Sequence, residues 1–403
     1  MSADPPTTAR RPAPAPFTHD GSGTRVWFEP GAVERLAEQP AIQGAKRIML
    51  VCGQNTARSQ AFARIRRTLG ERVCVTLDRV VEHSMAALVE DGAALAGERA
   101  IDLLLAVGGG SASDTAKAIA IVLAEGGRLA DHANVFTPPA NYQQRALPAA
   151  KLPIVVVPTT LSAAEVTPGL GIHDGAGRKL LFWDAKVVPR LIVLDPVAAC
   201  EVPAGVFATT GMNALAHCVE GLYSRTRNPI CDALALGGIE LLARALPAVV
   251  ADPGDVAARG GALTGANLSG QVIANARVGV HHAICHALGT VGGLSHGVAN
   301  AVMLPFAMRY NLEVAAPALA RVALALGEDL RGHSEEAAAN RAISAVDRLR
   351  ERIGVPRCLR ETGLDRSRLE RIAAHTMGDR GLYFNPRPTT DPQALIRLLE
   401  TAW

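Results

Sequence analysis

Three histidines, His282, His286 and His296, are the residues of this chain best suited to chemistry. His282 and His286 are four residues apart, which on a helix places both imidazoles on one face. Imidazole is the commonest neutral metal ligand and the usual proton shuttle near neutral pH. Histidines on an otherwise apolar segment are costly to bury unless each finds a partner. The spacing therefore predicts an active site, in preference to three core histidines bonded to backbone carbonyls.

A second pair, Asn213 and His217, is also four residues apart and shares a helical face. His217, His282 and His296 would supply three nitrogen ligands and leave a position open, which is the pattern of a catalytic divalent metal such as iron or zinc. Asn213 offers only a neutral amide oxygen, which binds a cation more weakly than a carboxylate. The sequence leaves open whether a metal binds, and His286 remains available as an acid or base.

A glycine-rich turn joins an expected strand to an expected helix. Residues 101–107 form a short apolar run typical of a buried parallel strand, and residues 112–120 have the composition of a helix. Between them lie Gly108, Gly109, Gly110 and Ser111. This order brings backbone amides and a helix N-terminus against a phosphate without a Cβ clash. A plain turn is the alternative, because the Gly-x-Gly-x-x-Gly fingerprint is missing.

A further apolar strand, residues 154–157, is followed by three hydroxyl side chains, Thr159, Thr160 and Ser162. Ligands bind outside the carboxyl ends of the strands in open α/β sheets. The hydroxyls are therefore placed to contact ribose and phosphate, although a simple capped turn has the same composition.

These segments resemble, in order along the chain, the iron-containing (group III) alcohol dehydrogenase superfamily, from residues 25–32 to the C-terminus. In that family a Gly-Gly-Gly-Ser turn binds the dinucleotide pyrophosphate, a Pro-Thr-Thr segment follows, and an Asp with three His holds a divalent metal. The resemblance implies an α/β fold, with an N-terminal parallel-sheet dinucleotide-binding domain followed by an all-helical C-terminal domain. It also implies an oxidoreductase.

Three details are similar to the maleylacetate reductase branch of that superfamily. Asn213 stands where the metal-binding alcohol dehydrogenases carry Asp, the segment 158–165 is one residue shorter than theirs, and residues 383–388 and 398–403 look like the reductases' C-terminus. This branch reduces maleylacetate to 3-oxoadipate in aromatic degradation, so the resemblance implies a dicarboxylate substrate. Asp114 is more similar to the alcohol dehydrogenases, and a metal-dependent enzyme for a small alcohol or aldehyde is the alternative.

The choice of cofactor depends on Gly53, which follows an expected strand at residues 47–51. Alcohol dehydrogenases of the superfamily often carry Asp there, and an acid at the ribose rejects the 2′-phosphate of NADP. Gly53 therefore predicts that both NADH and NADPH are used. Further candidates for contacts with the cofactor are Asn55, Asp114 and Lys179.

For catalysis, His286 is the expected proton donor. His217, His282 and His296 would hold either a metal or the oxyanion that forms when hydride adds to a conjugated ketone. Arg387 is the expected anchor for a substrate carboxylate, because a planar guanidinium binds a carboxylate with two hydrogen bonds. A solvated surface arginine is the alternative for Arg387. A non-enzymatic scaffold would require a damaged cofactor turn, and Gly108 to Ser111 are intact.

The chain has 403 residues and a net charge of only +3, spread without clusters, which argues against nucleic acid as a partner. No apolar run approaches the roughly 20 residues of a membrane span, and no signal peptide is visible. Seven scattered cysteines without Cys-x-x-Cys spacing indicate reduced thiols in the cytoplasm. A homodimer is expected.

The βα alternation of a parallel sheet occupies the first half, including expected strands at residues 73–77 and 191–194, and helices follow. The expected division is a disordered tail over 1–21, a dinucleotide-binding domain over 22–199 and a helical catalytic domain over 200–403. Glycines lie in the first half and histidines in the second, so the site is expected in the cleft between the domains.

Overall fold

The computed structural model describes residues 16–82, 84–138, 140–175 and 178–403. Within these residues one parallel sheet has six strands in the order β1-β10-β7-β4-β2-β3. The strands are β1 (Arg25–Phe28), β2 (Ile48–Val51), β3 (Val73–Leu77), β4 (Leu103–Gly108), β7 (Ile154–Pro158) and β10 (Leu191–Leu194). All neighbours in this order are parallel.

The strands are short apolar runs because helices bury both faces of the sheet. In β2, Met49 and Val51 belong to one core cluster and Ile48 and Leu50 to another, as the two-residue period of a strand requires. The first cluster is covered by α4 (Ala86–Glu98) and α5 (Gly110–Glu125), and the second by α3 (Gln60–Leu69). The short helices α1 (Pro40–Gln43), α2 (Gln54–Ala57) and α6 (Pro196–Ala199) lie in connections.

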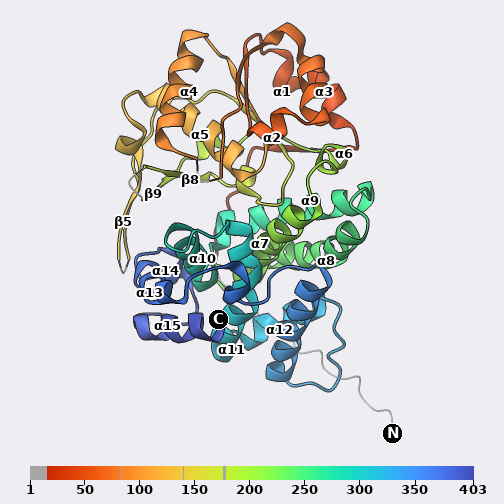
Figure 1. Cartoon of the computed structure of the whole chain (residues 1–403), viewed down its shortest axis with the longest axis vertical. Helices are drawn as coiled ribbons and strands as arrows, with labels where there is room; N and C mark the ends of the chain where they lie inside the picture. Colours follow the sequence, from red (N-terminus) through yellow and green to blue (C-terminus); the bar gives the residue numbers. More distant parts are fainter. Residues whose placement is uncertain (1–15, 83, 139, 176–177) are drawn as a thin grey trace.

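Two antiparallel hairpins extend from the sheet region toward the helices (Figure 1). They are formed by β5 (Val135–Thr137) with β6 (Asn141–Gln143), and by β8 (Gly169–His173) with β9 (Lys179–Trp183). Lys117 of α5 holds the second hairpin, because its buried Nζ donates hydrogen bonds to the carbonyl oxygens of Thr167 and Gly169 at 2.6 and 3.3 Å.

The second half of the chain is helical. Its helices are α7 (Ala204–Tyr223), α8 (Pro229–Ala251), α9 (Val256–Ala276), α10 (Val280–Thr290), α11 (His296–Ala325), α12 (Glu335–Arg352), α13 (Leu369–Thr376), α14 (Gly381–Phe384) and α15 (Pro392–Thr401). Helix α7 is the most enclosed, since nearly every residue from Gly211 to Tyr223 is buried. Chemistry placed on α7 is therefore shielded from water.

The sheet followed by helices confirms the expected fold class. The boundary at residues 199 and 200 stays a prediction; it falls between α6 and α7. Most of the expected tail, residues 1–15, lies outside the described residues. Its described part contacts the helical region, where the backbone N–H of Asp20 donates to Oδ1 of Asn275 at 2.7 Å.

Among the described residues one helix, α8, is long and apolar enough to cross a membrane. Asp232, Glu240 and Arg244 interrupt α8, so it is not an unbroken apolar run, and a single such helix is weak evidence for a membrane span. The helix packs along α7 and α9, and Ile239 and Leu242 are fully buried in the core of the helical region. Core helices of other proteins pass the same test of length and composition, although only 39% of the apolar window of α8 is buried.

Candidate active site

Four histidines from three helices lie together. His217 comes from α7, His282 and His286 from α10, and His296 begins α11. The ring of His282 lies 4.7, 6.2 and 5.8 Å from those of His217, His286 and His296, and the rings of His286 and His296 are stacked at 5.7 Å. The structure thus brings together all four histidines that the sequence singles out.

Glu220 fixes the start of α10 against α7. Its carboxylate is fully buried; Oε1 accepts hydrogen bonds from the backbone N–H groups of Gly279 and His281 at 2.9 and 3.0 Å, and Oε2 bonds to Nδ1 of His282. Such a carboxylate sets the orientation of a histidine and decides which ring nitrogen faces the site. Burial raises the pKa of Glu220 to about 7. The sequence analysis missed this residue, although Asn213, His217 and Glu220 follow the helical spacing of one face.

The inner histidines are held neutral. Burial lowers the pKa values of His217, His282 and His296 well below the usual value, and the neighbouring histidines lower them further. A neutral imidazole carries one N–H donor and one lone pair. In His282 the N–H lies on Nδ1 and donates to Glu220, and in His217 it lies on Nδ1 and donates to Oγ of Ser269, so Nε2 of both rings carries the lone pair.

His286 has a different environment. Its side chain is 29% exposed, and Nδ1 bonds to Oδ2 of Asp379 at 2.8 Å. Burial pushes the pKa of Asp379 up, but His286 and the backbone N–H of Gly381 outweigh it, so this pKa is lowered overall. An ionised carboxylate on Nδ1 leaves Nε2 of His286 free to exchange a proton. Asp379 was not predicted, because it lies 93 residues beyond His286 in a segment without a recognisable motif.

The donor set does not fit a formed metal site. Nε2 of His282 lies 3.2 Å from Oδ1 of Asn213, whose Nδ2 donates to the carbonyl of Ser162 at 3.3 Å. The amide thus binds protein groups on both sides and brings no negative charge. In the part of the chain that the structure describes, no three His, Cys, Asp or Glu side chains are arranged to hold a metal ion.

The glycine turn packs closely against the segment after β7. A Cβ on Gly109 would lie 3.2 Å from Oγ1 of Thr160, and one on Gly110 would lie 2.9 Å from Oγ of Ser162. Gly108 has a φ of +131°, which side chains rarely adopt. The two segments predicted to contact the cofactor therefore meet at the start of α5, where backbone N–H groups can bind a pyrophosphate.

Polar atoms without partners line the first turns of α5. Oγ of Ser113 and Oδ1 of Asp114 are buried without hydrogen-bond partners, while Oδ2 of Asp114 accepts from the N–H of Gly171 at 3.0 Å. Buried polar groups are normally paired. Together with the glycine cradle, these atoms fit a bound dinucleotide. Ser111 and Thr159 lie in the same two segments.

Gly53 and Lys179 border this region from either side. Gly53 precedes α2, which carries Asn55, and a Cβ on Gly53 would lie 2.8 Å from the carbonyl oxygen of Val80. Backbone packing therefore keeps this position free of a side chain. Lys179 begins β9. Burial raises the pKa of Asp114 and the charge of Lys179 opposes that rise, whereas burial lowers the pKa of His296 and the charge of Lys179 adds to that lowering. Lys179 thus acts on the cofactor turn and on the histidines.

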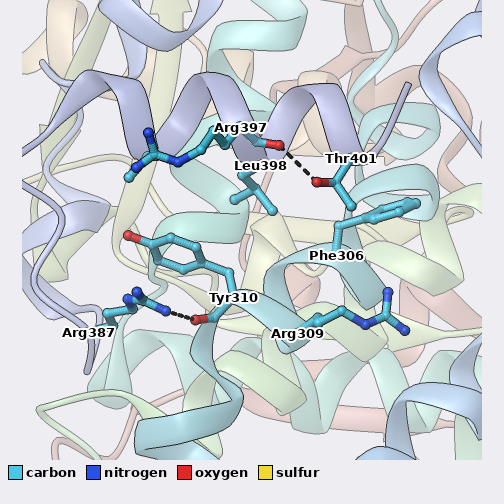
Figure 2. Close-up of a pocket in the computed structure, with 8 residues that line it drawn as sticks. Phe306, Arg309, Tyr310, Arg387, Arg397, Leu398 and Thr401 are labelled. Carbon is cyan, nitrogen blue, oxygen red and sulfur yellow. Dashed lines mark hydrogen bonds between the residues drawn. The ribbon is translucent and has the colours of Figure 1, made fainter.

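Arg387 is not brought to the histidines. Its guanidinium donates to the carbonyl of Tyr310 at 2.9 Å and lies 4.6 Å from the centre of that ring, in a pocket between α11 and α15 (Figure 2). Tyr310 and His296 are on the same helix, 14 residues apart by number, which at 1.5 Å per residue is roughly 21 Å. Arg387 therefore does not contact a substrate held at the histidines.

Comparison with known proteins gives two family matches that span the chain. Residues 23–196 match the family described as iron-containing alcohol dehydrogenase, and residues 207–403 match the C-terminal part of the Fe-containing alcohol dehydrogenase family.

Individual relatives cover almost all of both chains. Maleylacetate reductase from Sphingobium indicum is 32% identical over 96% of this chain and 97% of its own. NAD-dependent methanol dehydrogenase from Bacillus methanolicus is 30% identical over 92% and 96%. The solved structure of a 1,3-propanediol oxidoreductase superimposes with a TM-score of 0.89 at 31% identity, over 96% of this chain and 100% of that one.

Proposed function

The chain belongs to the iron-containing alcohol dehydrogenase family and is an NAD(P)-dependent oxidoreductase, and from this premise we propose that it is a maleylacetate reductase. It reduces maleylacetate to 3-oxoadipate. The proposed catalytic residues are His217, His282, His286 and His296. The proposed cofactor contacts are Gly53, Asn55, Gly108, Gly109, Gly110, Ser111, Asp114, Thr159, Thr160, Ser162 and Lys179.

The observation that carries the proposal is the division of the histidines into a neutral inner group and His286 with its carboxylate. His217, His282 and His296 are neutral, whereas His286 is bonded to Asp379 and reaches solvent. Reduction of a conjugated ketone needs both functions, since a negative charge develops on the carbonyl oxygen and a proton must reach the adjacent carbon. Asn213 adds no carboxylate that would repel this charge.

When bound, the reduced nicotinamide supplies a hydride to the alkene carbon farther from the ketone. The alkene electrons then move toward the ketone, and an enolate forms. The imidazole N–H of His296, whose ring packs beside those of His282 and His286, donates a hydrogen bond to the enolate oxygen, which is the usual means of stabilising such a charge. His286 delivers the proton to the enolate carbon from Nε2, while Asp379 keeps Nδ1 bonded and stabilises the protonated ring. The ketone is restored, and His286 regains a proton from solvent.

Both NADH and NADPH serve as the reductant in this proposal. The carbonyl of Val80 keeps position 53 without a side chain, so no carboxylate there repels a 2′-phosphate. Steady-state kinetics with the two cofactors test this. Comparable kcat/KM values support it, and a preference of several orders of magnitude for NADH contradicts it.

The second candidate is a metal-dependent alcohol dehydrogenase for a small alcohol or aldehyde. Three neutral imidazoles within one cluster favour it, because the neutral form is the metal ligand, and the Bacillus methanolicus relative is a methanol dehydrogenase. The neutral amide of Asn213 and its two protein contacts weigh against it.

Absorbance of NADH separates the two candidates. The enzyme is mixed with NADH and either maleylacetate or a panel of aldehydes, in the presence and absence of a chelator. Rapid oxidation with maleylacetate, slow oxidation with every aldehyde and no loss with chelator are expected. Efficient aldehyde reduction that the chelator abolishes assigns the chain to the second candidate.

The protein is further proposed to be a cytoplasmic homodimer that serves the degradation of aromatic compounds. All seven cysteines are free thiols, which agrees with a reducing compartment. Sedimentation equilibrium of the purified protein tests the dimer, and a mass equal to one chain contradicts it.

A further inference from the structure

Arg277 has a backbone conformation that side chains avoid. It follows α9 directly, with φ of 63° and ψ of 166°. This region is populated almost only by glycine. Among the described residues only Ala100, Ala163 and Arg277 combine a side chain with positive φ, and Arg277 has by far the largest side chain of the three. An arginine in this conformation indicates that the side chain is retained for a purpose other than folding.

The guanidinium of Arg277 is partly buried, and it has no hydrogen-bond partner among the residues that the structure describes. It stacks 3.9 Å from the ring of Trp183 on β9, and its Nη1 is shielded from solvent without an acceptor. Burial, together with the charge of Arg380, lowers the pKa of Arg277 to about 10. A buried hydrogen-bond donor normally has a partner. Burying an unpaired cation costs more free energy than burying an unpaired neutral donor.

Arg380 shares these features. Its guanidinium stacks 3.7 Å from the ring of Tyr142 on β6 and 5.1 Å from Phe384. Within the described ranges neither Arg277 nor Arg380 forms a side-chain hydrogen bond or an ion pair. The carboxylate that acts on the pKa of Arg277 is that of Asp20, whose effect is the weakest of those that shift this pKa. Two neighbouring cations without a carboxylate repel each other, and an anion between them would remove that repulsion.

The two arginines are close in sequence to residues that build the histidine cluster. Arg380 follows Asp379, which bonds to His286, and Arg277 lies two residues before Gly279, the N-cap of the helix that carries His282 and His286. The rings on which they stack come from the two hairpins that extend toward α10 and α14 in Figure 1. The pair therefore lies where the hairpins meet the end of α9 and the start of α14.

We propose that Arg277 and Arg380 together bind a carboxylate of the substrate and select dicarboxylates over neutral aldehydes. The aromatic rings cover a face of each guanidinium, so the N–H edges remain for a planar carboxylate. The pair thus takes the part that the sequence suggested for Arg387. The proposal deepens the function proposed above and rests on it for the identity of the substrate.

Arg277→Gly is the principal test, because glycine removes the guanidinium and suits the backbone conformation. We expect KM for maleylacetate to rise at least tenfold, with kcat changed less than threefold, KM for NADH unchanged and the melting temperature not lowered. Arg380→Gln should raise the same KM and covers the case that Arg277→Gly does not fold. Arg244→Ala, at an exposed position on α8, is the matched control and should behave as the wild type. An unchanged KM for maleylacetate in both variants overturns the proposal.

A binding measurement keeps this result separate from the proposed function. Adipate is titrated calorimetrically into the wild-type enzyme saturated with NAD⁺, and into Arg277→Gly. Binding to the wild type that weakens at least tenfold in the variant supports the arginine pair, even if maleylacetate is not reduced. No binding to the wild type, or equal binding to both proteins, overturns it. If only the proposed maleylacetate reduction is wrong, the wild-type enzyme binds adipate but does not oxidise NADH with maleylacetate.

Discussion

Glu220 on α7 bonds to Nδ1 of His282 on α10, and both side chains are buried. Through this bond one helix sets the ring orientation of a histidine on another. Since Oε1 of the same carboxylate also accepts two backbone N–H groups at the start of α10, the helix and the catalytic ring are positioned by a single residue. The cluster is therefore part of the core of the helical region and not a feature added at its surface.

Replacing Glu220 with alanine is expected to destabilise the protein. The change leaves two backbone donors and the neutral ring of His282 without their acceptor, and each buried donor left unsatisfied typically costs about 1–3 kcal/mol. Urea unfolding measures the loss. Glu220→Gln keeps an amide oxygen for the backbone N–H groups and should lose less. Equal stability of Glu220→Ala and the wild type contradicts the anchoring role.

His286→Ala is expected to lower kcat for maleylacetate by roughly 10²–10⁴-fold, which is the usual contribution of a general acid. The partly exposed side chain can be removed with little effect on the fold. Asp379→Asn should lower kcat less, because the proton donor remains. Single-turnover measurements at saturating NADH separate this effect from binding. A variant of His286 with wild-type kcat assigns the proton to another donor.

The stability of the protein should depend on pH through Glu165. Burial raises the pKa of this carboxyl from 4.5 to about 7. The folded state therefore holds a proton that the unfolded state has released, and the stabilisation that Glu165 contributes is complete below about pH 4.5 and lost as the pH rises through about 7. Glu165→Gln removes this titration. As the pH rises across this interval, the unfolding free energy of the wild type should fall relative to that of the variant. A difference between the two free energies that does not change with pH contradicts the assignment.

Gly110→Ala is expected to weaken NADH binding at least tenfold. The added Cβ would lie 2.9 Å from Oγ of Ser162 and displace the segment after β7 from the glycine turn. Quenching or enhancement of NADH fluorescence measures the dissociation constant. Gly261→Ala on α9 is the matched control, since its Cβ would meet Ala245 at 3.6 Å, an ordinary contact. Equal affinities of the two variants would place the cofactor elsewhere.

Asn213→Asp is expected to raise the affinity for divalent metal without improving maleylacetate reduction. The substitution restores a negative charge beside His282, and carboxylates bind divalent cations more strongly than amides. Metal analysis after dialysis measures the affinity, and wild-type activity should survive a chelator. If the wild type instead holds stoichiometric, tightly bound metal and loses its activity when the metal is removed, the protein is a metal-dependent alcohol dehydrogenase.

Much of the sheet could be predicted from local sequence. The apolar runs at residues 73–77 and 191–194 coincide with β3 and β10, because a parallel strand buried on both faces is a continuous apolar run. The hairpins β5–β6 and β8–β9 were not predicted. They are three to five residues long and are only partly buried, so their composition carries little signal.

The histidines could be found from their spacing, but their partners could not. Asp379 reaches His286 from 93 residues away, and this contact depends on how α14 packs against α10. The placement of Arg387 also depends on tertiary packing, since the C-terminal segment turns its side chain toward Tyr310 of α11. Arg277 carried no signal in the sequence, because its backbone conformation is visible only in the fold.

The position of the transferred hydride tests the central claim most directly. The enzyme is given maleylacetate and NADH that carries deuterium at the transferred position, and the product is analysed by NMR. A maleylacetate reductase places the deuterium on the methylene next to the carboxylate farther from the ketone of 3-oxoadipate, with a solvent proton on the neighbouring carbon. Deuterium on an alcohol carbon, or no turnover of maleylacetate beside rapid reduction of an aldehyde, would contradict the account.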